Sequence, residues 1–172
     1  MSAPDPAALA RTVDEAVIRS LQQAYADVVN RRAWAELADL FLPDLVLDLD
    51  LGTVHLRADG PEGVGAFIGE RLDEFDFFEF VVLSSVVTLA PDGDPDHATA
   101  RLYMCELRHA VADGRFTIAY GVYHDDHRRV DGRWWFARRR YTSWARTAAD
   151  GPRALDVFAF PRPSAPGPSP AP

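Results

Sequence analysis

Apolar residues recur with helical spacing near the start of the chain. The pattern predicts a helix from about Val13 to Asn30, and Thr12 with Glu15 would start it as a capping box. The residues of the apolar stripe would pack on the core, and they are Val17, Ile18, Leu21, Tyr25 and Val28. Tyr25 is therefore expected to point inward.

Two more helices and two short strands are predicted before the middle of the chain. A helix from Ala33 to Leu40 would bury Trp34 and end before Pro43. Residues 45–51 alternate apolar and acidic side chains, which is typical of a strand, and residues 53–57 could form the return strand. The next helix would begin near Asp59-Gly-Pro-Glu62 and run to about Phe75.

Strand patterns fill the second half of the chain. Four long segments, residues 77–89, 98–111, 116–130 and 133–145, are separated by turns that each contain Asp-Gly. Turns at such regular spacing predict an antiparallel meander. Helices that precede one curved antiparallel sheet give an α+β domain in which the helices cover one face of the sheet.

The chain of 172 residues is long enough for one domain with a sizeable core. We assign residues 11–147 to this domain and residues 1–10 to a flexible N-terminus. Residues 148–172 would be an extended or disordered tail, because residues 161–172 contain six prolines and cannot form a core. Phe158 and Phe160, just before the prolines, could still dock on the domain or on a partner subunit.

Charge and composition exclude several classes of function. The formal net charge of −8 opposes binding to nucleic acid, and no apolar run approaches the roughly 18 residues of a membrane span. The N-terminus has no basic segment followed by an apolar one, so a cytoplasmic location is expected. Cys105 is the only cysteine, which excludes an intrachain disulfide and a thiolate metal cluster.

Four phrases carry a resemblance to a known family. They are Ile18-Arg-Ser-Leu-Gln-Gln-Ala-Tyr25, Trp34-Ala-Glu-Leu-Ala-Asp-Leu-Phe41, Gly121-Val-Tyr-His-Asp125 and Asp131-Gly-Arg-Trp-Trp-Phe-Ala-Arg-Arg-Arg140. Over about residues 11–146 the chain resembles the SnoaL-like branch of the nuclear-transport-factor-2-like superfamily. The resemblance implies a cone-shaped α+β barrel, with three N-terminal helices packed in a strongly curved antiparallel sheet and a deep pocket at the open end. We also expect a homodimer or a higher homo-oligomer.

This chain departs from the family pattern at two positions. Many relatives carry an acid five residues after the tyrosine of the first helix, where this chain has Asn30. An amide cannot act as a general base, although Asn30 can orient a substrate carbonyl or a water, or cap the helix. Dehydratase-like members often have a histidine at the start of the first long strand, where this chain has Phe80.

The strand from Gly121 to His127 carries the leading candidates for chemistry. Tyr123, Asp125 and His127 share one face of this strand, and the resemblance implies that this face lines the pocket. Asp125 would be the general base, His127 a proton shuttle and Tyr123 a donor to a developing enolate oxygen. Alternatively, the opposite face lies inward. A metal site is not expected, since the two histidines of His124-Asp-Asp-His127 face opposite ways.

Other candidates surround this strand. Tyr25 would be a further catalytic residue, or else a core tyrosine. The residues expected to contact the substrate are Asn30, Trp34, Phe80, Tyr103 and His109. Tyr103 and His109 share one face of the preceding strand, and Glu106 and Arg108 share the other. Arg138-Arg-Arg140 is expected mainly to pair with carboxylates.

The sequence thus predicts a small-molecule pocket protein. We expect a cofactor-independent cyclase, dehydratase or isomerase of secondary metabolism that acts by acid/base chemistry on an apolar or aromatic substrate. No phosphate-binding loop, nucleophile elbow or metal-spaced His/Cys group indicates another mechanism. The alternatives are a non-catalytic ligand-binding or accessory protein, or the small subunit of a ring-hydroxylating dioxygenase.

Overall fold

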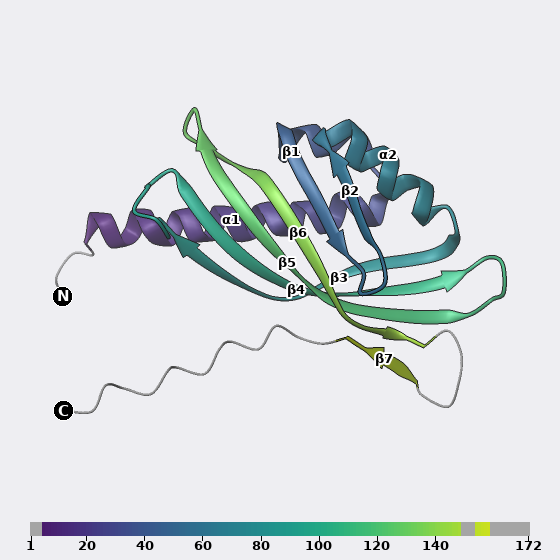
Figure 1. Ribbon diagram of the computed structural model, residues 1–172. Helices are drawn as coiled ribbons and strands as arrows, with labels where there is room; N and C mark the ends of the chain where they lie inside the picture. The colour runs from purple at the N-terminus through teal and green to yellow at the C-terminus, as the bar shows by residue number, and fades with distance from the viewer. Residues whose placement is uncertain (1–4, 149–153, 159–172) are drawn as a thin grey trace, which may run out of the picture.

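The protein folds into a curved sheet that holds its longest helix on the concave side (Figure 1). A computed structural model describes residues 5–148 and 154–158. Its elements are α1 (Pro6–Arg31), a 3-10 helix η1 (Trp34–Asp39), β1 (Phe41–Asp50), β2 (His55–Asp59), α2 (Gly60–Leu72), β3 (Phe75–Leu89), β4 (His97–Ala110), β5 (Phe116–Val130), β6 (Arg133–Thr147) and β7 (Leu155–Val157). This arrangement confirms the predicted α+β class.

The strands follow the order β2-β1-β6-β5-β4-β3, and β7 adds to β6. All neighbours pair antiparallel except β1 and β6, which run parallel, so the sheet is mixed and not wholly antiparallel as predicted. The sheet is strongly curved and does not close into a barrel (Figure 1). The four long strands lie within about two residues of their predicted bounds.

The first helix begins earlier than predicted. Asp5 caps it by accepting a hydrogen bond from the Ala7 amide at 3.1 Å, and Pro6 occupies the first turn, where its missing N–H costs nothing. Thr12 does not cap a helix, because its hydroxyl donates to the Ala8 carbonyl one turn earlier. Residues 6–10 of the predicted flexible N-terminus are therefore helical, and residues 1–4 lie outside the described part of the chain.

The predicted second helix is a single 3-10 segment, Trp34–Asp39. Pro43 does not end it but lies within β1, where the pairing of β1 with β6 shifts between Phe41 and Val46. A proline is tolerated at such an irregularity since it has no N–H to give to the neighbouring strand.

The chain after Thr147 returns to the sheet as β7, which was not predicted. Beyond β7 the Phe158 amide donates to the Trp144 carbonyl at 2.9 Å. The Phe158 ring packs against Gly52, where a Cβ would lie 2.6 Å from the ring and where φ is +85°. Docking of Phe158 on the domain is thus confirmed, whereas Phe160 and the proline-rich residues lie outside the described part of the chain.

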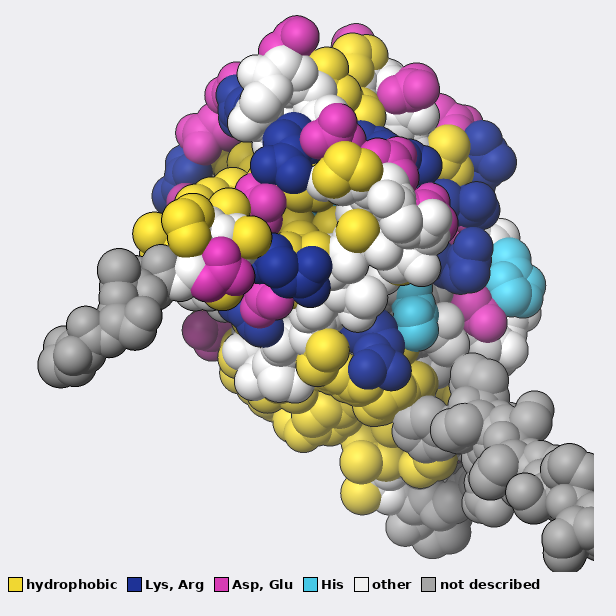
Figure 2. Space-filling view, turned by 90° about the vertical axis from the view of Figure 1, so that its left-hand side faces the viewer, with side chains coloured by type: hydrophobic (Ala, Val, Ile, Leu, Met, Phe, Trp, Pro, Cys, Tyr) yellow, Lys and Arg dark blue, Asp and Glu magenta, His cyan; other side chains and the backbone are white. Residues whose placement is uncertain are grey.

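The core lies between α1 and the concave face of the sheet. Its centre is a group of aromatic rings in which Tyr25 contacts Phe41, Phe80, Tyr123 and Phe136 at centroid distances of 5.5 to 6.2 Å. On the face of the molecule shown in Figure 2, arginines and acidic side chains are interleaved. No helix in residues 5–148 or 154–158 is long and apolar enough to cross a membrane.

Candidate functional site

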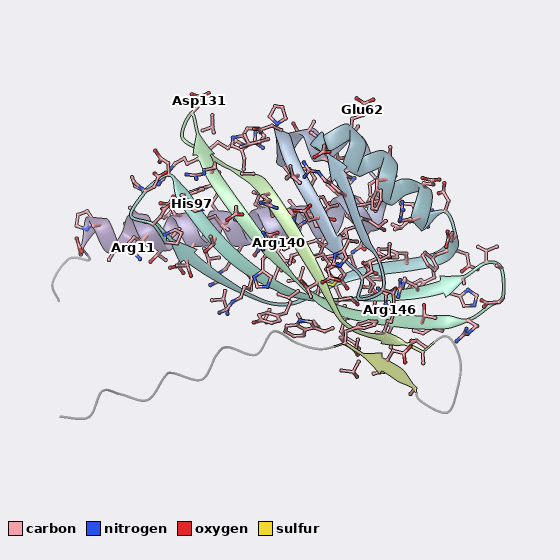
Figure 3. The ribbon with its side chains drawn as sticks, in the orientation of Figure 1. Arg11, Glu62, His97, Asp131, Arg140 and Arg146 are labelled. Atoms are coloured by element: carbon pink, nitrogen blue, oxygen red, sulfur yellow. The ribbon has the colours of Figure 1, made fainter. Side chains whose placement is uncertain are left out.

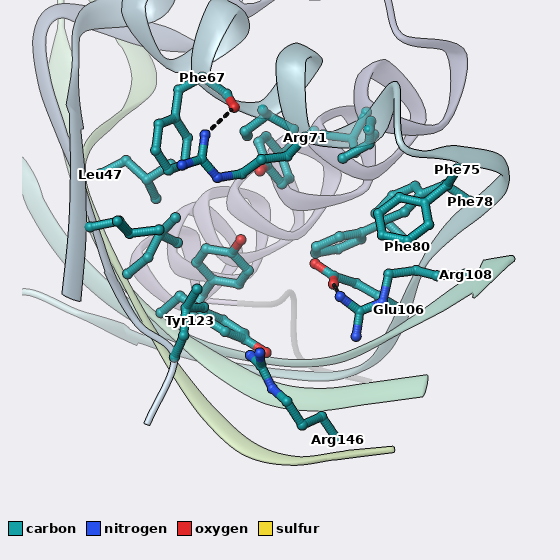
Figure 4. Close-up of a pocket in the computed structure, with 18 residues that line it drawn as sticks. Leu47, Phe67, Arg71, Phe75, Phe78, Phe80, Glu106, Arg108, Tyr123 and Arg146 are labelled. Carbon is teal, nitrogen blue, oxygen red and sulfur yellow. Dashed lines mark hydrogen bonds and ion pairs between the residues drawn. The ribbon is translucent and has the colours of Figure 1, made fainter. Parts of the chain in front are cut away.

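A cavity of about 770 Å³, including its open mouth, lies between α1, α2 and the concave face of the sheet (Figure 4). Eighteen residues line it. Most are apolar, and the buried residues that form its floor include Tyr25, Val29, Leu47, Phe80, Tyr123 and Tyr141. The charged residues on the lining are Arg71, Glu106, Arg108 and Arg146. The cavity therefore combines an aromatic floor with a charged rim.

The register of the sheet brings two of these charged residues together. Glu106 of β4 is paired with Ala119 of β5, and Ala119 is paired with Arg146 of β6. The two outer Cα atoms are thus about 10 Å apart, two strand spacings. Ala119 is buried and small, so it leaves room above it for the longer side chains to approach each other.

Glu106 is the one carboxylate among the described residues that line the cavity. Burial raises the pKa of Glu106, and the positive charges of Arg108 and Arg146 oppose this rise. The side chain is 22% exposed, and its nearest charged atom is Arg108 Nη1, at 3.6 Å. A partly desolvated carboxylate of this kind is a stronger base than a carboxylate in water.

The three arginines of the cavity are held differently. Arg71 donates a hydrogen bond to the Phe67 carbonyl at 3.0 Å, and its guanidinium lies 3.6 Å from the centroid of the Phe67 ring (Figure 4). Arg108 and Arg146 are less constrained. Each has a buried Nε–H that finds no acceptor within residues 5–148 and 154–158. Both side chains therefore keep N–H groups that no described residue binds.

Three tyrosines contribute hydroxyl groups to the floor of the cavity. Burial raises the pKa of Tyr25, Tyr123 and Tyr141, so all three are protonated hydrogen-bond donors. The Tyr141 ring lies across Gly121 on the neighbouring strand, where any Cβ would overlap it. Glycine at this position is what allows Tyr141 to lie flat against β5.

Tyr123, Asp125 and His127 do share the concave face of β5, but only Tyr123 reaches the cavity. Asp125 is bound by Arg139, with Nε to Oδ1 at 2.8 Å and Nη2 to Oδ2 at 3.2 Å, and by the Gln22 amide at 3.3 Å. Both side chains of the ion pair are fully buried. Asp125 is thus half of a buried ion pair and does not line the cavity.

Aromatic rings separate this ion pair from the cavity. The guanidinium of Arg139 lies 4.0 Å from the Tyr25 ring centroid, 4.1 Å from that of Tyr123 and 4.4 Å from that of Phe136. Tyr25 and Tyr123 line the cavity, so the ion pair lies behind its floor. A substrate in the cavity would meet these rings before it met the carboxylate.

His127 is buried behind the same floor. Its ring lies 4.7 Å from that of Phe136, and neither ring nitrogen has a hydrogen-bond partner in the described residues. Burial lowers the pKa of His127 to about 4, so the imidazole is neutral at physiological pH. The predicted proton shuttle therefore has no exposed surface and lies outside the lining of the cavity.

Asn30 and Phe80, the two departures from the family pattern, are bound to each other. The Asn30 amide donates to the Phe80 carbonyl at 3.1 Å and accepts from the Phe80 amide at 2.7 Å. Phe80 lines the cavity as predicted, whereas Asn30 does not. The amide of Asn30 fastens the end of α1 to β3.

The remaining predicted contact residues also lie elsewhere. Trp34 packs against Gly65 and Gly69 of α2. Tyr103 contacts the Trp144 ring at 5.3 Å on the convex face of the sheet, and His109 is held by Asp76 at 2.6 Å. None of these three lines the cavity.

The sequence analysis did not place Glu106 and Arg108 in the site, because it took the face of β4 that carries Tyr103 and His109 to be the inward one. On the inward face of this strand, Leu102 and Met104, both fully buried, come directly before the two charged residues. The two apolar residues in phase with Glu106 were the signal that could have found it. No three His, Cys, Asp or Glu side chains of the described residues gather closely enough to hold a metal ion.

Comparison with models of protein families identifies the family of this chain. The model of the SnoaL-like domain matches residues 10–140, about three quarters of the chain. This chain belongs to the SnoaL-like domain family. A search of curated proteins finds no match.

Solved structures share the fold of this chain. A candidate scytalone dehydratase from Novosphingobium aromaticivorans is 19% identical, with a TM-score of 0.70 and coverage of 89% of this chain and 97% of that chain. A hexachlorocyclohexane dehydrochlorinase, LinA-type3 from Novosphingobium barchaimii, is 18% identical, with a TM-score of 0.71 and coverage of 90% and 99%. At these identities the likeness establishes the fold alone.

Proposed function

We propose that this SnoaL-like protein is a cofactor-independent lyase or isomerase that removes a proton from a carbon atom of an apolar or aromatic substrate. The observation that carries the proposal is the Glu106 carboxylate, which is the one carboxylate among the described residues of the cavity lining and whose pKa is raised by burial. A base of this kind is most effective when its pKa lies near the working pH. Dehydration, dehydrochlorination and isomerisation can all begin with such a proton transfer.

Glu106 is a better candidate for the base than Asp125, which the sequence favoured. Both oxygens of Asp125 already accept hydrogen bonds from Arg139, and the ion pair is fully buried. Glu106 meets only a loose contact with Arg108, at 3.6 Å, and it is open to the cavity. The hydroxyl of Tyr141 and the guanidinium of Arg146 line the same cavity and would stabilise negative charge that develops on the substrate.

The names of the structural neighbours agree with this class of reaction. A dehydratase removes water and a dehydrochlorinase removes hydrogen chloride, and both reactions break a C–H bond beside a leaving group.

A generic elimination substrate tests the proposal without knowledge of the natural one. In 5-nitrobenzisoxazole a base takes the single ring C–H proton, the N–O bond breaks, and a coloured cyanophenolate forms. We expect Glu106→Gln to lower the elimination rate by about 100-fold or more. The matched control is Glu79→Gln on the adjacent strand, since Glu79 is exposed and does not line the cavity. If wild-type protein is no faster than Glu106→Gln, the proposal is wrong.

A further inference from the structure

The side chains that line the cavity carry more positive than negative charge. Three guanidiniums, from Arg71, Arg108 and Arg146, face one carboxylate, from Glu106. The whole chain has a formal charge of −8, so this local excess of positive charge runs against the overall charge of the protein. A positive rim around an apolar floor attracts a molecule with a hydrophobic body and a negative group.

Arg108 and Arg146 have the donors to bind such a group. In the described residues Arg108 makes one polar contact, the 3.6 Å approach to Glu106. Arg146 makes one long hydrogen bond, from Nη2 to the Ser143 hydroxyl at 3.4 Å. A guanidinium carries five N–H groups in a planar fork that fits a carboxylate. The other contacts of these guanidiniums are with aromatic rings, Phe75 for Arg108 and Phe158 for Arg146, which occupy none of the N–H groups in the plane of the fork.

The positions of the two arginines allow them to act together. Arg108 lies two residues after Glu106 on the same face of β4, and Arg146 stands beside Glu106 across Ala119. In Figure 4 Glu106 and Arg108 lie at one wall of the cavity and Arg146 reaches toward it from below. Arg71 approaches from the opposite wall, where the Phe67 carbonyl and ring hold its guanidinium.

We propose that the cavity binds a flat apolar monoanion, a carboxylic acid in its ionised form, whose carboxylate is held by Arg108 and Arg146. At the wall where the carboxylate would lie, Arg108, Arg146 and an ionised Glu106 leave a single positive charge, which one carboxylate neutralises; Arg71 belongs to the opposite wall, where the Phe67 carbonyl and ring hold it. A dianion such as a phosphate monoester would leave a net negative charge beside Glu106. This inference rests on the proposed function, because it takes the cavity to be the active site.

Binding of matched ligands tests the inference independently of catalysis. Isothermal titration calorimetry would compare 2-naphthoate with 2-naphthamide, a neutral molecule of the same shape, and with 2-naphthyl phosphate. We expect 2-naphthoate to bind at least about tenfold more tightly than the amide, as charge-assisted hydrogen bonds to a carboxylate would give. The phosphate is expected to bind more weakly than the carboxylate.

Variants of the arginines test where the carboxylate of the ligand binds. Arg146→Gln and Arg108→Gln should each weaken binding of 2-naphthoate about tenfold or more and leave binding of the amide nearly unchanged. Arg140→Gln is the control, because Arg140 lies on the same strand as Arg146 but is exposed on the convex face (Figure 3). Equal affinity for the carboxylate and the amide, or an equal loss in the Arg140 variant, would overturn the inference.

The two proposals can fail separately. Glu106→Gln should retain or strengthen binding of 2-naphthoate, since it removes a like charge from the site. Selective carboxylate binding together with an unchanged elimination rate in Glu106→Gln would remove the proposed function and keep the anion site. Loss of elimination activity in Glu106→Gln without carboxylate selectivity would remove the anion site alone.

Discussion

The buried pair of Asp125 and Arg139 provides a sharp test of how the fold is stabilised. In Asp125→Asn the Arg139 guanidinium keeps its charge but loses its counterion, while its side chain remains fully buried. Removing one partner of such a pair costs about 3 to 5 kcal/mol. That is a large share of the 5 to 15 kcal/mol, roughly, that stabilises an ordinary domain.

The adjacent arginine supplies the control. Arg138 pairs with Asp48 at 2.7 Å, but these side chains are 46% and 28% exposed. Water screens such a pair, so Asp48→Asn should cost no more than about 1 kcal/mol. The two substitutions are chemically identical, and the sites differ in burial and in the number of hydrogen bonds that the carboxylate accepts.

Urea unfolding followed by tryptophan fluorescence measures both losses. The double variant Asp125→Leu with Arg139→Met should recover most of the stability lost in Asp125→Asn, because an apolar pair leaves no charge in the core. If Asp125→Asn costs no more than Asp48→Asn, the ion pair is not the buried stabilising element that we describe.

Three further predictions concern single residues. Burial lowers the pKa of His127 from 6.5 to about 4, so protonation of this histidine favours the unfolded chain. The free energy of unfolding should therefore fall by about 3 kcal/mol as the pH drops from 6.5 to 4. His127→Leu should remove this part of the pH dependence, measured as the difference from wild type. Gly121→Ala should push the Tyr141 ring into the cavity and weaken 2-naphthoate binding in calorimetry, at a cost of about 1 to 3 kcal/mol in urea unfolding. Asn30→Asp loses the donor to the Phe80 carbonyl, so it should lower the free energy of unfolding by about 1 to 3 kcal/mol. An unchanged free energy of unfolding would contradict the stabilising role of the hydrogen bonds between Asn30 and Phe80.

Most of the fold could be predicted because it follows local rules. Alternation with period two defined the long strands, and Asp-Gly turns such as Asp131-Gly132 separated them. The start of α1 was missed because its first turns pack on nothing: residues 5–13 are exposed, and the first fully buried side chain is that of Ile18. The parallel pairing of β1 with β6 could not be foreseen, since it joins segments about ninety residues apart in the chain.

The site was predicted less well, for a physical reason. The alternation of side chains along β5 correctly placed Tyr123, Asp125 and His127 on one face, but it could not show how deeply each residue is buried. Depth depends on the neighbours across the sheet, and the rings around Arg139 bury Asp125 behind the cavity floor. The pairing of Glu106 with Arg146 through Ala119 depends on register, which a single strand pattern does not contain.

The pH profile of the elimination reaction tests the central claim most directly. If Glu106 is the base, kcat/KM rises with pH at a midpoint above the ordinary value for a glutamate, because burial raises its pKa. Arg146→Gln removes a positive charge that holds this pKa down, so it should move the midpoint further upward. Glu106→Gln should abolish the rise. A midpoint that persists in Glu106→Gln, or that does not move in Arg146→Gln, would contradict the assignment of Glu106 as the base.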